Sequence, residues 1–518
     1  MNARYSLLQR LRNGTSAIAL LGALAGLTGC VGVPYKRPSV ATPSAFKEDA
    51  PSAYRGAPAG TWRPAQPQAA ALKGRWWQVF GDPELNGLEE QLNAGNQNIA
   101  AAFASFMAAR AQVSAARASY FPALSAGADY SRSGQGANVS GIGATTTAAT
   151  AGRGTYSEFQ LPFDASWEPD LWGRIRETVR AYRYAAQVSA ADLESMRLSE
   201  QASLAAYYFQ LRGQDSLQAL YDRTVEADRE SLDLTRTLYR TGIDDDEAVT
   251  QAEVTLENAQ AAAIGIADDR ALYEHAIATL IGKPASSVAL PVRKLTTPVP
   301  SIPVGVPSEL LQRRPDIAAS ERTMAEANAQ IGIARSAYFP TLDLTTSGGA
   351  TSTAASSVFD ASALFWSVGA ALSETLFDGG LRRATVAQYA ATYRADEASY
   401  RETVLTAFQQ VEDELATLRI LSQQLARQHA AVAAAQRYLA IARARYQTGI
   451  DPYLNVMTAE QTLLSDQQTE LTLRVNLMTA AVGLVQALGG GWGIEQLPKA
   501  AAITSPGALR EVTRGGAR

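Results

Sequence analysis

The chain holds very few residues that could act as a nucleophile, a general base or a transition-metal ligand. Its 518 residues include one cysteine, Cys30, and two histidines, His275 and His429. One cysteine cannot form an internal disulfide, and a zinc site built from cysteine and histidine needs about four such ligands. Neither histidine has a nucleophile or a paired acid at a recognisable spacing. We therefore expect no catalytic residue, no metal site and no cofactor, and the composition argues against an enzyme.

Bulk composition limits the remaining classes of protein. The chain is 47% apolar and 19% charged, so it can bury large surfaces and is not globally disordered. Its formal net charge is −4, which does not favour binding to nucleic acid. The length allows three or four domains at about 150 residues each.

The first thirty residues indicate export. Three arginines precede an apolar run from Ala17 to Leu27, and the segment ends Leu27-Thr28-Gly29-Cys30. The run is too short to span a bilayer comfortably, as in a signal peptide, and no later stretch is apolar enough to do so. The ending resembles the lipobox of bacterial lipoproteins, which implies that residues 1–29 are removed and that Cys30 receives an S-diacylglycerol and an N-acyl chain such as palmitate. Val31, which is not Asp, implies sorting to the outer membrane. An incidental cysteine after an ordinary signal peptide is the alternative.

Prolines divide the rest of the chain. Two proline-rich segments, residues 30–83 and 284–314, are predicted to be an extended N-terminal tether and a linker. Because proline breaks helices, the proline-free stretches elsewhere permit long helices. We expect one unit over residues 84–283, a second over 315–488 and a C-terminal tail over 489–518.

The two units are copies of one sequence. Tyr120-Phe121-Pro122 recurs as Tyr338-Phe339-Pro340, 218 positions later, and Thr241-Gly242-Ile243-Asp244 recurs as Thr448-Gly449-Ile450-Asp451, 207 positions later. These matches predict an internal two-fold duplication. Each copy is expected to contain a helix, a β-hairpin, a long helix and a return helix.

Each copy has two segments in which apolar residues alternate with others. They are 124–130 and 159–167 in the first copy, and 342–344 and 364–373 in the second. A period of two is typical of a strand with two unlike faces, so we expect four strands per chain. The residues between them, 131–157 and a shorter Gly/Ser/Thr-rich stretch, are expected as loops. A small soluble sheet is the alternative, which outward aromatic residues argue against.

A long helix is expected after each hairpin. Residues 173–240 and 380–447 contain no proline, and each run would reach about 100 Å as one helix at about 1.5 Å per residue. Together with the strands, these runs predict a mixed, mainly α fold.

Both long helices end at a Thr-Gly-Ile-Asp turn. Gly242 and Gly449 suit helix C-caps, because glycine tolerates a positive φ. Asp244 and Asp451 are expected to cap the return helices, with Pro452 in the first turn of the second one. The acidic run that starts at Asp244 is either a solvated cap, a docking surface for a partner protein or a ring that attracts ions.

The sheet requires association of several chains. Four strands with two open edges cannot sit in lipid, because unpaired backbone groups are costly there. A transmembrane barrel needs about eight strands at least. Several chains are therefore expected to share one barrel in the membrane, continued by one long helical tube.

The order of the motifs resembles that of the outer-membrane efflux family (outer membrane factors), in particular its lipoprotein branch, which serves resistance–nodulation–division pumps of Gram-negative bacteria. The resemblance rests on the lipobox, Pro34-Tyr35-Lys36-Arg37-Pro38, Trp76-Trp77, both Tyr-Phe-Pro motifs, both Thr-Gly turns, Arg313-Arg314-Pro315-Asp316-Ile317 and Ala487-Leu488-Gly489-Gly490-Gly491-Trp492.

The resemblance implies a lipid-anchored homotrimer in the cell outer membrane. Three chains would share a twelve-strand transmembrane β-barrel and a periplasmic α-helical tunnel. A periplasmic adaptor would dock at the helical tips, Thr241–Asp244 and Thr448–Asp451, and a proton-driven inner-membrane pump would load the cargo.

The resemblance also implies a periplasmic gate just after the second tip turn, where a tyrosine and two acids constrict the tunnel. Tyr446 matches the tyrosine, whereas Asn455 and Thr458 occupy the two acidic positions. This chain therefore lacks both gate carboxylates, and an acid ring that traps cations is not expected. We expect helix packing and hydrogen bonds to hold the tip shut.

Three functions fit this organisation to different degrees. The favoured one is a passive export duct for drugs or other toxic small molecules, as in multidrug resistance. A type I protein-secretion duct of the same fold is an alternative that the lipobox and the C-terminal motif disfavour. A coiled-coil lipoprotein without a pore would not need the hairpins. No residue specifies the cargo, the adaptor or the pump.

Overall fold

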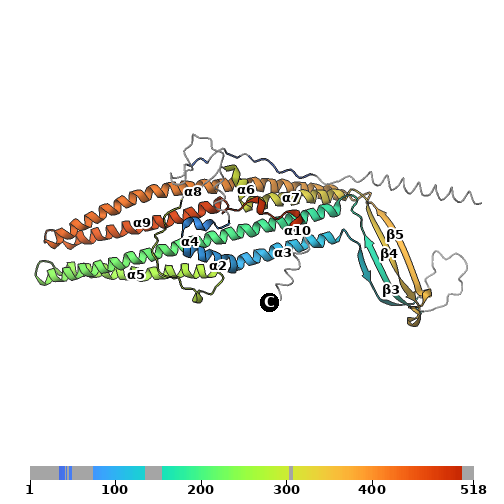
Figure 1. Cartoon of the computed structure of the whole chain (residues 1–518), viewed down its shortest axis with the longest axis horizontal. Helices are drawn as coiled ribbons and strands as arrows, with labels where there is room; N and C mark the ends of the chain where they lie inside the picture. Colours follow the sequence, from blue (N-terminus) through green and yellow to red (C-terminus); the bar gives the residue numbers. More distant parts are fainter. Residues whose placement is uncertain are drawn as a thin grey trace, which may run out of the picture.

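The computed structural model describes residues 34–40, 42–43, 46–48, 74–134, 155–300, 302 and 307–503. These residues form an elongated molecule with a sheet at one end and two helical hairpins reaching to the other (Figure 1). The predicted signal peptide 1–29, Cys30 and residues 504–518 of the predicted tail lie outside the described residues.

Four long helices form two antiparallel pairs. Helix α4 (Arg174–Arg240) returns as α5 (Asp246–Leu280), and α8 (Leu381–Gln447) returns as α9 (Tyr453–Ala487). Helices α4 and α8 each contain 67 residues, and α5 and α9 each contain 35. The pairs contact each other mainly through α4 and α9. Both proline-free runs are thus confirmed as continuous helices.

Shorter helices extend the two pairs toward the sheet. Helix α2 (Pro83–Gly95) leads into α3 (Gln97–Ala118), which packs along α4, and α7 (Pro315–Ser336) packs against α4 and α8. The remaining segments are η3 (Trp76–Phe80), η4 (Ala285–Ser287), η5 (Pro307–Glu309), α6 (Leu310–Arg313), η6 (Ala355–Ser357), η7 (Ala361–Ala363), η8 (Ile494–Gln496) and α10 (Ala500–Ile503).

Helix α3 differs from expectation in one respect. Among the described residues, it is the one helix long and apolar enough to cross a membrane by length and composition. The expectation that no such stretch follows the leader was therefore wrong. In the structure α3 lies along α4 as part of the helical bundle.

Equivalent junctions in the two halves are joined by similar side-chain to backbone hydrogen bonds. Asn96 Nδ2 donates to the Leu280 carbonyl oxygen at 2.9 Å, and Arg314 Nη1 donates to the Ala487 carbonyl oxygen at 2.9 Å. Each donor precedes a 22-residue helix, and each acceptor ends a 35-residue helix. A Cβ at Gly489 would lie 2.1 Å from the carbonyl oxygen of the residue before Arg314, and φ there is +92°. Glycine is therefore required at this close approach.

The sheet is antiparallel throughout. Its strands are β1 (Ala123–Ala126), β2 (Asp129–Gly134), β3 (Thr155–Trp167), β4 (Thr341–Ser352) and β5 (Leu364–Ser373). Strands β1 and β2 both pair with β3, which pairs with β4, which pairs with β5.

Strands β1 and β2 are one strand interrupted by a proline in its partner. Ala126 pairs with Phe163 and Asp129 with Gln160, so the register is continuous across the gap. Pro162 lies opposite the gap and has no backbone N–H to donate. Its carbonyl oxygen still accepts from Gly127 N at 3.0 Å. When β1 and β2 are counted as one strand, the described residues contain the four strands that the sequence predicts.

Strands extend into both segments that were expected as loops. Residues 131–134 belong to β2, and 155–157 belong to β3. In the second half, β4 runs through the Gly/Ser/Thr-rich stretch to Ser352. Small residues are needed there, because a Cβ at Gly349 would lie 2.1 Å from the Leu161 carbonyl oxygen of the neighbouring strand.

The end of the predicted N-terminal tether is folded. Trp76, Trp77 and Phe80 are buried in the main hydrophobic core, and Trp76 Nε1 donates to Gln201 Oε1 at 3.0 Å. An extended tether over all of 30–83 was therefore wrong for residues 74–83, because three large aromatic rings gain more from burial than from exposure.

Residues 34–48 of the tether, where described, lack helix and strand and lie against the helices. Tyr35 OH donates to Glu321 Oε1 at 2.7 Å, and Arg37 Nη2 donates to Tyr400 OH at 2.9 Å. The Glu412 carboxylate accepts from the backbone N–H groups of Lys47 and Glu48.

A buried ion network attaches the proline-rich linker to the helices. Asp215 accepts from Arg212 Nη1 at 2.6 Å, from Arg270 Nε at 2.7 Å and from the backbone N–H of Arg293 at 2.9 Å. Its side chain is fully buried. Arg212 also donates to the Pro291 carbonyl oxygen at 2.7 Å. The linker is thus bound to α4 and α5 by charge-assisted hydrogen bonds.

Candidate functional site at the helical tips

The two hairpin tips lie side by side and have the same geometry. Gly242 and Gly449 follow the C-caps of α4 and α8 with φ of 75° and 71°. Ile243 N donates to the Leu238 carbonyl oxygen, and Ile450 N donates to the equivalent oxygen of Arg445. This bonding closes the last helical turn as in a Schellman motif. Ile243 and Ile450 are both largely exposed, so each tip presents an apolar side chain to the surroundings.

The expected caps of the return helices were wrong in both copies. Asp245, not Asp244, caps α5, and its Oδ1 accepts from Ala248 N at 3.0 Å. Pro452, not Asp451, occupies the N-cap position of α9, which begins one residue later. Each displaced aspartate instead accepts a hydrogen bond from another side chain, Tyr446 in the case of Asp244 and Arg445 in the case of Asp451.

Asp451 pairs with Arg445 within its own tip. The Nε–Oδ2 distance is 2.6 Å and the Nη2–Oδ1 distance is 3.0 Å. The Arg445 guanidinium lowers the pKa of Asp451, and a hydrogen bond from Asn455 adds to this effect. A lowered pKa means that the pair persists at neutral pH and is lost only as the pH falls through the lowered value.

Asp244 instead accepts a hydrogen bond from the predicted gate tyrosine. Tyr446 OH donates to Asp244 Oδ2 at 2.6 Å and lies 3.0 Å from Thr235 Oγ1. Tyr446 is 4% exposed, and its ring packs against that of Tyr453 with centroids 5.5 Å apart. Burial and the bond to Asp244 raise the pKa of Tyr446, so the phenol keeps its proton and donates. This contact joins α8 to the tip of the other helical pair.

The two other predicted gate residues lie on the first turns of α9. Thr458 is exposed, and its hydroxyl donates to the Leu454 carbonyl oxygen of the same helix at 2.8 Å. Asn455 is half-buried, and its side chain bonds to Asp451. The structure thus brings Tyr446 to the contact between the pairs, whereas the bonds recorded for Asn455 and Thr458 stay within their own hairpin.

Sequence reasoning missed a polar stripe on the same face of α4. Asp228, Ser231 and Thr235 lie at helical spacing and face the second pair, where Ser231 Oγ donates to Glu460 Oε1 at 3.2 Å. We use the name "seam" for the α4 face that carries Asp228, Ser231 and Thr235, together with the residues of α8 and α9 that this face contacts. The sequence did contain a signal for this site. The duplication aligns Asp228 with Ala435, 207 residues later, so one copy has an acid where the other has an alanine.

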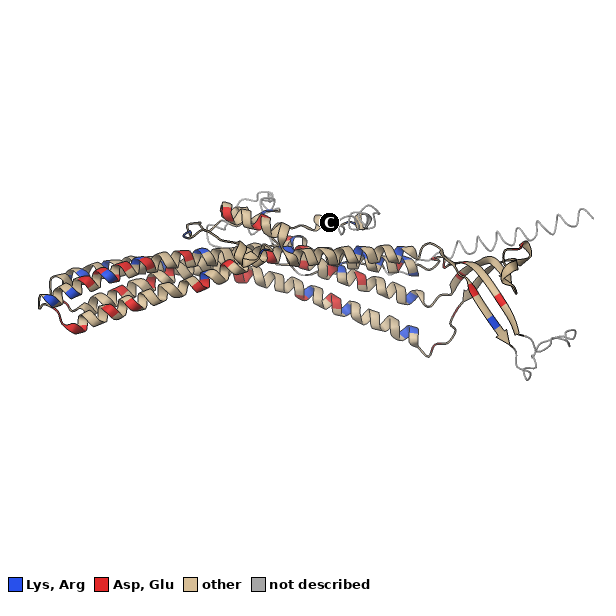
Figure 2. Ribbon diagram, turned by 90° about the horizontal axis from the view of Figure 1, so that it is seen from below, with Lys and Arg blue, Asp and Glu red and all other residues tan. Residues whose placement is uncertain are grey.

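The sheet at the opposite end has an apolar outer face. Leu364, Trp366, Val368 and Leu372 alternate along β5 and are each 69–82% exposed in the single chain. Charged residues are frequent along the helical pairs and few on the sheet (Figure 2). An exposed apolar band of this kind marks an interaction with lipid or protein.

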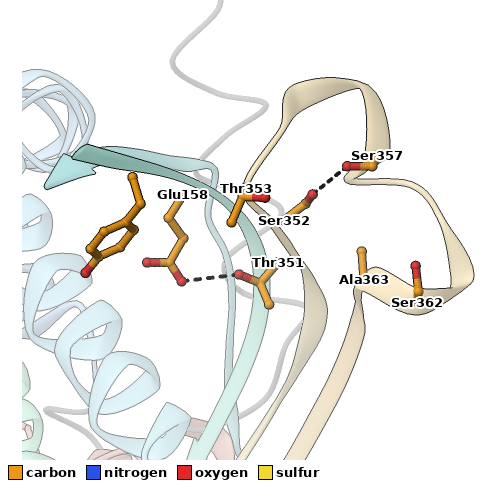
Figure 3. A pocket seen from close by; sticks show the side chains of 8 residues that line it. Glu158, Thr351, Ser352, Thr353, Ser357, Ser362 and Ala363 are labelled. Carbon is orange, nitrogen blue, oxygen red and sulfur yellow. Dashed lines mark hydrogen bonds between the residues drawn. The ribbon is translucent and has the colours of Figure 1, made fainter. Parts of the chain in front are cut away.

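A shallow hollow of about 590 Å³ lies at the end of the sheet farthest from the helices. Figure 3 shows its lining, in which Glu158 Oε1 accepts from Thr351 Oγ1 at 3.3 Å and the hydroxyls of Ser352 and Ser357 are 2.7 Å apart. No histidine or cysteine lines it. It offers hydroxyl groups and one carboxylate, without a nucleophile paired to a base.

Both histidines are exposed in the single chain. His429 is exposed, and its Nδ1 lies 3.3 Å from Glu470 Oε1. His275 lies within α5. Within the described ranges, there is no group of three or more His, Cys, Asp or Glu residues that could hold a metal ion.

Comparison with known families decides the classification. The sequence profile described as outer membrane efflux protein matches residues 88–283 and 306–490, which is well over half of the chain. The chain belongs to the outer membrane efflux protein family. This match confirms the family that the sequence motifs predicted. It also confirms the predicted location in the outer membrane.

Relatives of this outer membrane efflux protein carry names of the same kind. It is 31% identical over 448 residues to the probable efflux pump outer membrane protein TtgC of Pseudomonas putida KT2440, an alignment that covers 86% of this chain and 91% of the relative. It is 31% identical over 425 residues to the pyoverdine export outer membrane protein OpmQ of Pseudomonas aeruginosa PAO1, covering 81% and 87% of the two chains. The solved outer-membrane channel OprN superposes with a TM-score of 0.79 and 29% identity, covering 90% of this chain and all of that one.

Proposed function

We propose that three copies of this protein form the exit duct of a tripartite efflux system in the outer membrane. The observation that carries the proposal is the sheet, which exposes one apolar face and leaves its outer strands, β1–β2 and β5, with one neighbour each. Pairing β5 of one copy with β1–β2 of the next satisfies both edges and closes a barrel of twelve strands. Three-fold closure also places three helical bundles around one axis as a tunnel.

The repeated elements support a duplicated architecture. Helices of equal length recur in both halves, and the Asn96 and Arg314 junctions recur with them. Two similar hairpins per chain give a trimer six tips. The exposed Ile243 and Ile450 side chains at these tips suit the docking of a periplasmic adaptor, which would connect the duct to an inner-membrane pump.

The duct is proposed to be passive and to carry small molecules. Relatives are named for toluene, antibiotic and pyoverdine export, which supports small molecules as the cargo class. The scarcity of catalytic residues agrees with transport without chemistry. Lipidation of Cys30 would anchor the N-terminal tether at the same membrane, with affinity that grows with the number of buried acyl CH₂ groups.

The membrane role of the sheet is tested by introducing an arginine on either face of β5 and comparing the two variants. Val368→Arg places a charge on the apolar face, which costs about 2–4 kcal/mol per chain at the bilayer midplane. We expect the variant protein to be lost from the outer-membrane fraction and not to form an oligomer that resists SDS at room temperature. Ser367→Arg is the matched control, since Ser367 is adjacent on β5 but points to the opposite face. Equal recovery of both variants would contradict the proposed barrel.

A further inference from the structure

The seam between the helical pairs contains a buried acid with an unpaired oxygen. Asp228 of α4 is 2% exposed, and its Oδ2 has no hydrogen-bond partner within the described residues. Glu460 of α9 is 9% exposed and accepts from Arg443 Nη2 at 2.7 Å and from Ser231 Oγ. The second carboxylate oxygen of Glu460, Oε2, is also buried and has no hydrogen-bond partner among the described residues.

The charges at this point of the seam do not balance. Helix α8 contributes Arg443, and α9 contributes Glu460 and the buried phenol of Tyr453, whose hydroxyl likewise has no partner among the described residues. Arg443 is used by Glu460, so Asp228 has no cation of its own. The cation that α4 contributes to the hollow beside Asp228 is the exposed Arg223, which donates to the Ala219 carbonyl oxygen. The buried α5 residues of the adjacent core are apolar: Ala248, Ala252, Leu256 and Ala259.

The other copy shows that the acid is not needed to pack a helical pair. Arg236 and Glu253 form the equivalent ion pair, 207 positions earlier than Arg443 and Glu460, with an N–O distance of 2.8 Å and both side chains about half exposed. Ala435 stands where the repeat would place a second Asp228. The extra carboxyl therefore occurs only where one pair meets the other.

Protons can reach this site. A hollow of about 220 Å³ is lined by Asp228, Arg443, Glu460 and several leucines. Burial first, and Glu460 second, raise the pKa of Asp228 to about 7, whereas Arg443 acts in the opposite direction. The carboxyl is therefore neutral below that pH and ionised above it. A buried ionised group without a partner is costly, so ionisation favours any arrangement that lets water reach Asp228.

We propose that Asp228 is a proton-operated latch on the seam: when protonated it allows α4 to pack against α8 and α9, and when ionised it drives the two helical pairs apart near their tips. The movement of the seam follows from the contacts within one chain. Its consequence for export rests on the proposed function, because only an assembled duct has a conductance that the tips could control.

The test measures the distance between the two tips as a function of pH. Spin labels are placed at Thr241→Cys and Thr448→Cys, both exposed, in the protein purified from outer membranes, and distances are recorded from pH 5.5 to 8.5 by pulsed electron paramagnetic resonance. We expect the tip-to-tip distribution to widen with a midpoint near pH 7. Asp228→Asn, which keeps the shape and removes the ionisation, should hold the low-pH distribution throughout. Asp233→Asn, an exposed acid on the same helix, should behave as the parent.

A second variant covers the case in which Asp228→Asn folds poorly. Glu460→Gln removes the neighbouring negative charge and releases Arg443, so the midpoint should move to lower pH. A distribution that does not change with pH in the parent, or the same midpoint in Asp228→Asn or Glu460→Gln as in the parent, would overturn the latch. Conductance in planar bilayers is recorded on the same samples. A seam that moves without any change in conductance would support the latch and contradict the expectation that helix packing and hydrogen bonds at the tips close the duct.

Discussion

Tyr446→Phe is expected to loosen the contact between the two tips and, in the proposed duct, to raise the single-channel conductance of the purified protein in planar bilayers. The substitution removes one hydroxyl that donates to Asp244 and lies within hydrogen-bond distance of Thr235. Thr235 is fully buried, so its hydroxyl is left without this partner. Loss of a hydrogen bond to a charged group costs about 1.5–3 kcal/mol, which changes the ratio of open to closed tips about tenfold or more per chain.

The duplication supplies the matched control for this prediction. Tyr239 occupies the equivalent position of the first copy and is about half exposed, so Tyr239→Phe should leave the conductance close to that of the parent. If both variants conduct alike, the contact between Tyr446 and Asp244 does not hold the tip closed. Purification of both variants from the same membranes keeps the lipid composition constant.

Asp215→Ala is expected to lower the free energy of unfolding by about 1–3 kcal/mol per chain, because it removes a buried acceptor from two guanidinium groups and one backbone N–H. The cost is limited because Arg212 keeps its ion pair with Glu84 and Arg270 keeps its ion pair with Glu274. Arg212 is 3% exposed and Arg270 is 19% exposed, and the backbone N–H of Arg293 loses its acceptor as well. The proline-rich linker should also detach from α4 and α5. Thermal unfolding followed by circular dichroism at 222 nm measures the first effect, and limited proteolysis within residues 284–300 measures the second.

Asp233→Ala controls for the loss of an acid from α4, since Asp233 is exposed on the same helix. It should unfold at the temperature of the parent and resist proteolysis equally. If Asp215→Ala matched Asp233→Ala in both measurements, the ion network would not be what attaches the linker.

The long helices could be predicted from the sequence because two kinds of residue delimit them. Proline is absent from both long runs, and Gly173, Gly380, Gly242 and Gly449 adopt positive φ at their ends. These are local rules of backbone geometry that need no knowledge of tertiary contacts. The alternating strand β5 was equally readable, since one of its faces is apolar.

The cap of α5 and the full length of β4 could not be read in this way because distant residues decide them. Three consecutive aspartates, Asp244 to Asp246, give no local signal for which one caps α5, and Tyr446, 202 residues away, bonds to the first. Strand β4 loses its apolar alternation after Leu344, and Gly349 is required where the strand approaches the Leu161 carbonyl oxygen. Both outcomes follow from tertiary contacts that override local preference.

The seam shows what part of the site the sequence could have revealed. Asp228 and Glu460 lie on α4 and α9, far apart along the chain, and only packing of the two pairs brings them together. The duplication nevertheless marks Asp228 as unusual, because its counterpart is an alanine. The resemblance identified Tyr446, whereas its partners Asp244 and Thr235 required the structure.

Native mass spectrometry of the protein, extracted from outer membranes in mild detergent, tests most directly whether several chains complete one barrel. The open strand edges and the apolar face of β5 predict a single species with three times the mass of one chain isolated from the same membranes. A protein that leaves the membrane as a stable single chain, or whose assembly contains any other number of copies, would contradict the shared twelve-strand barrel.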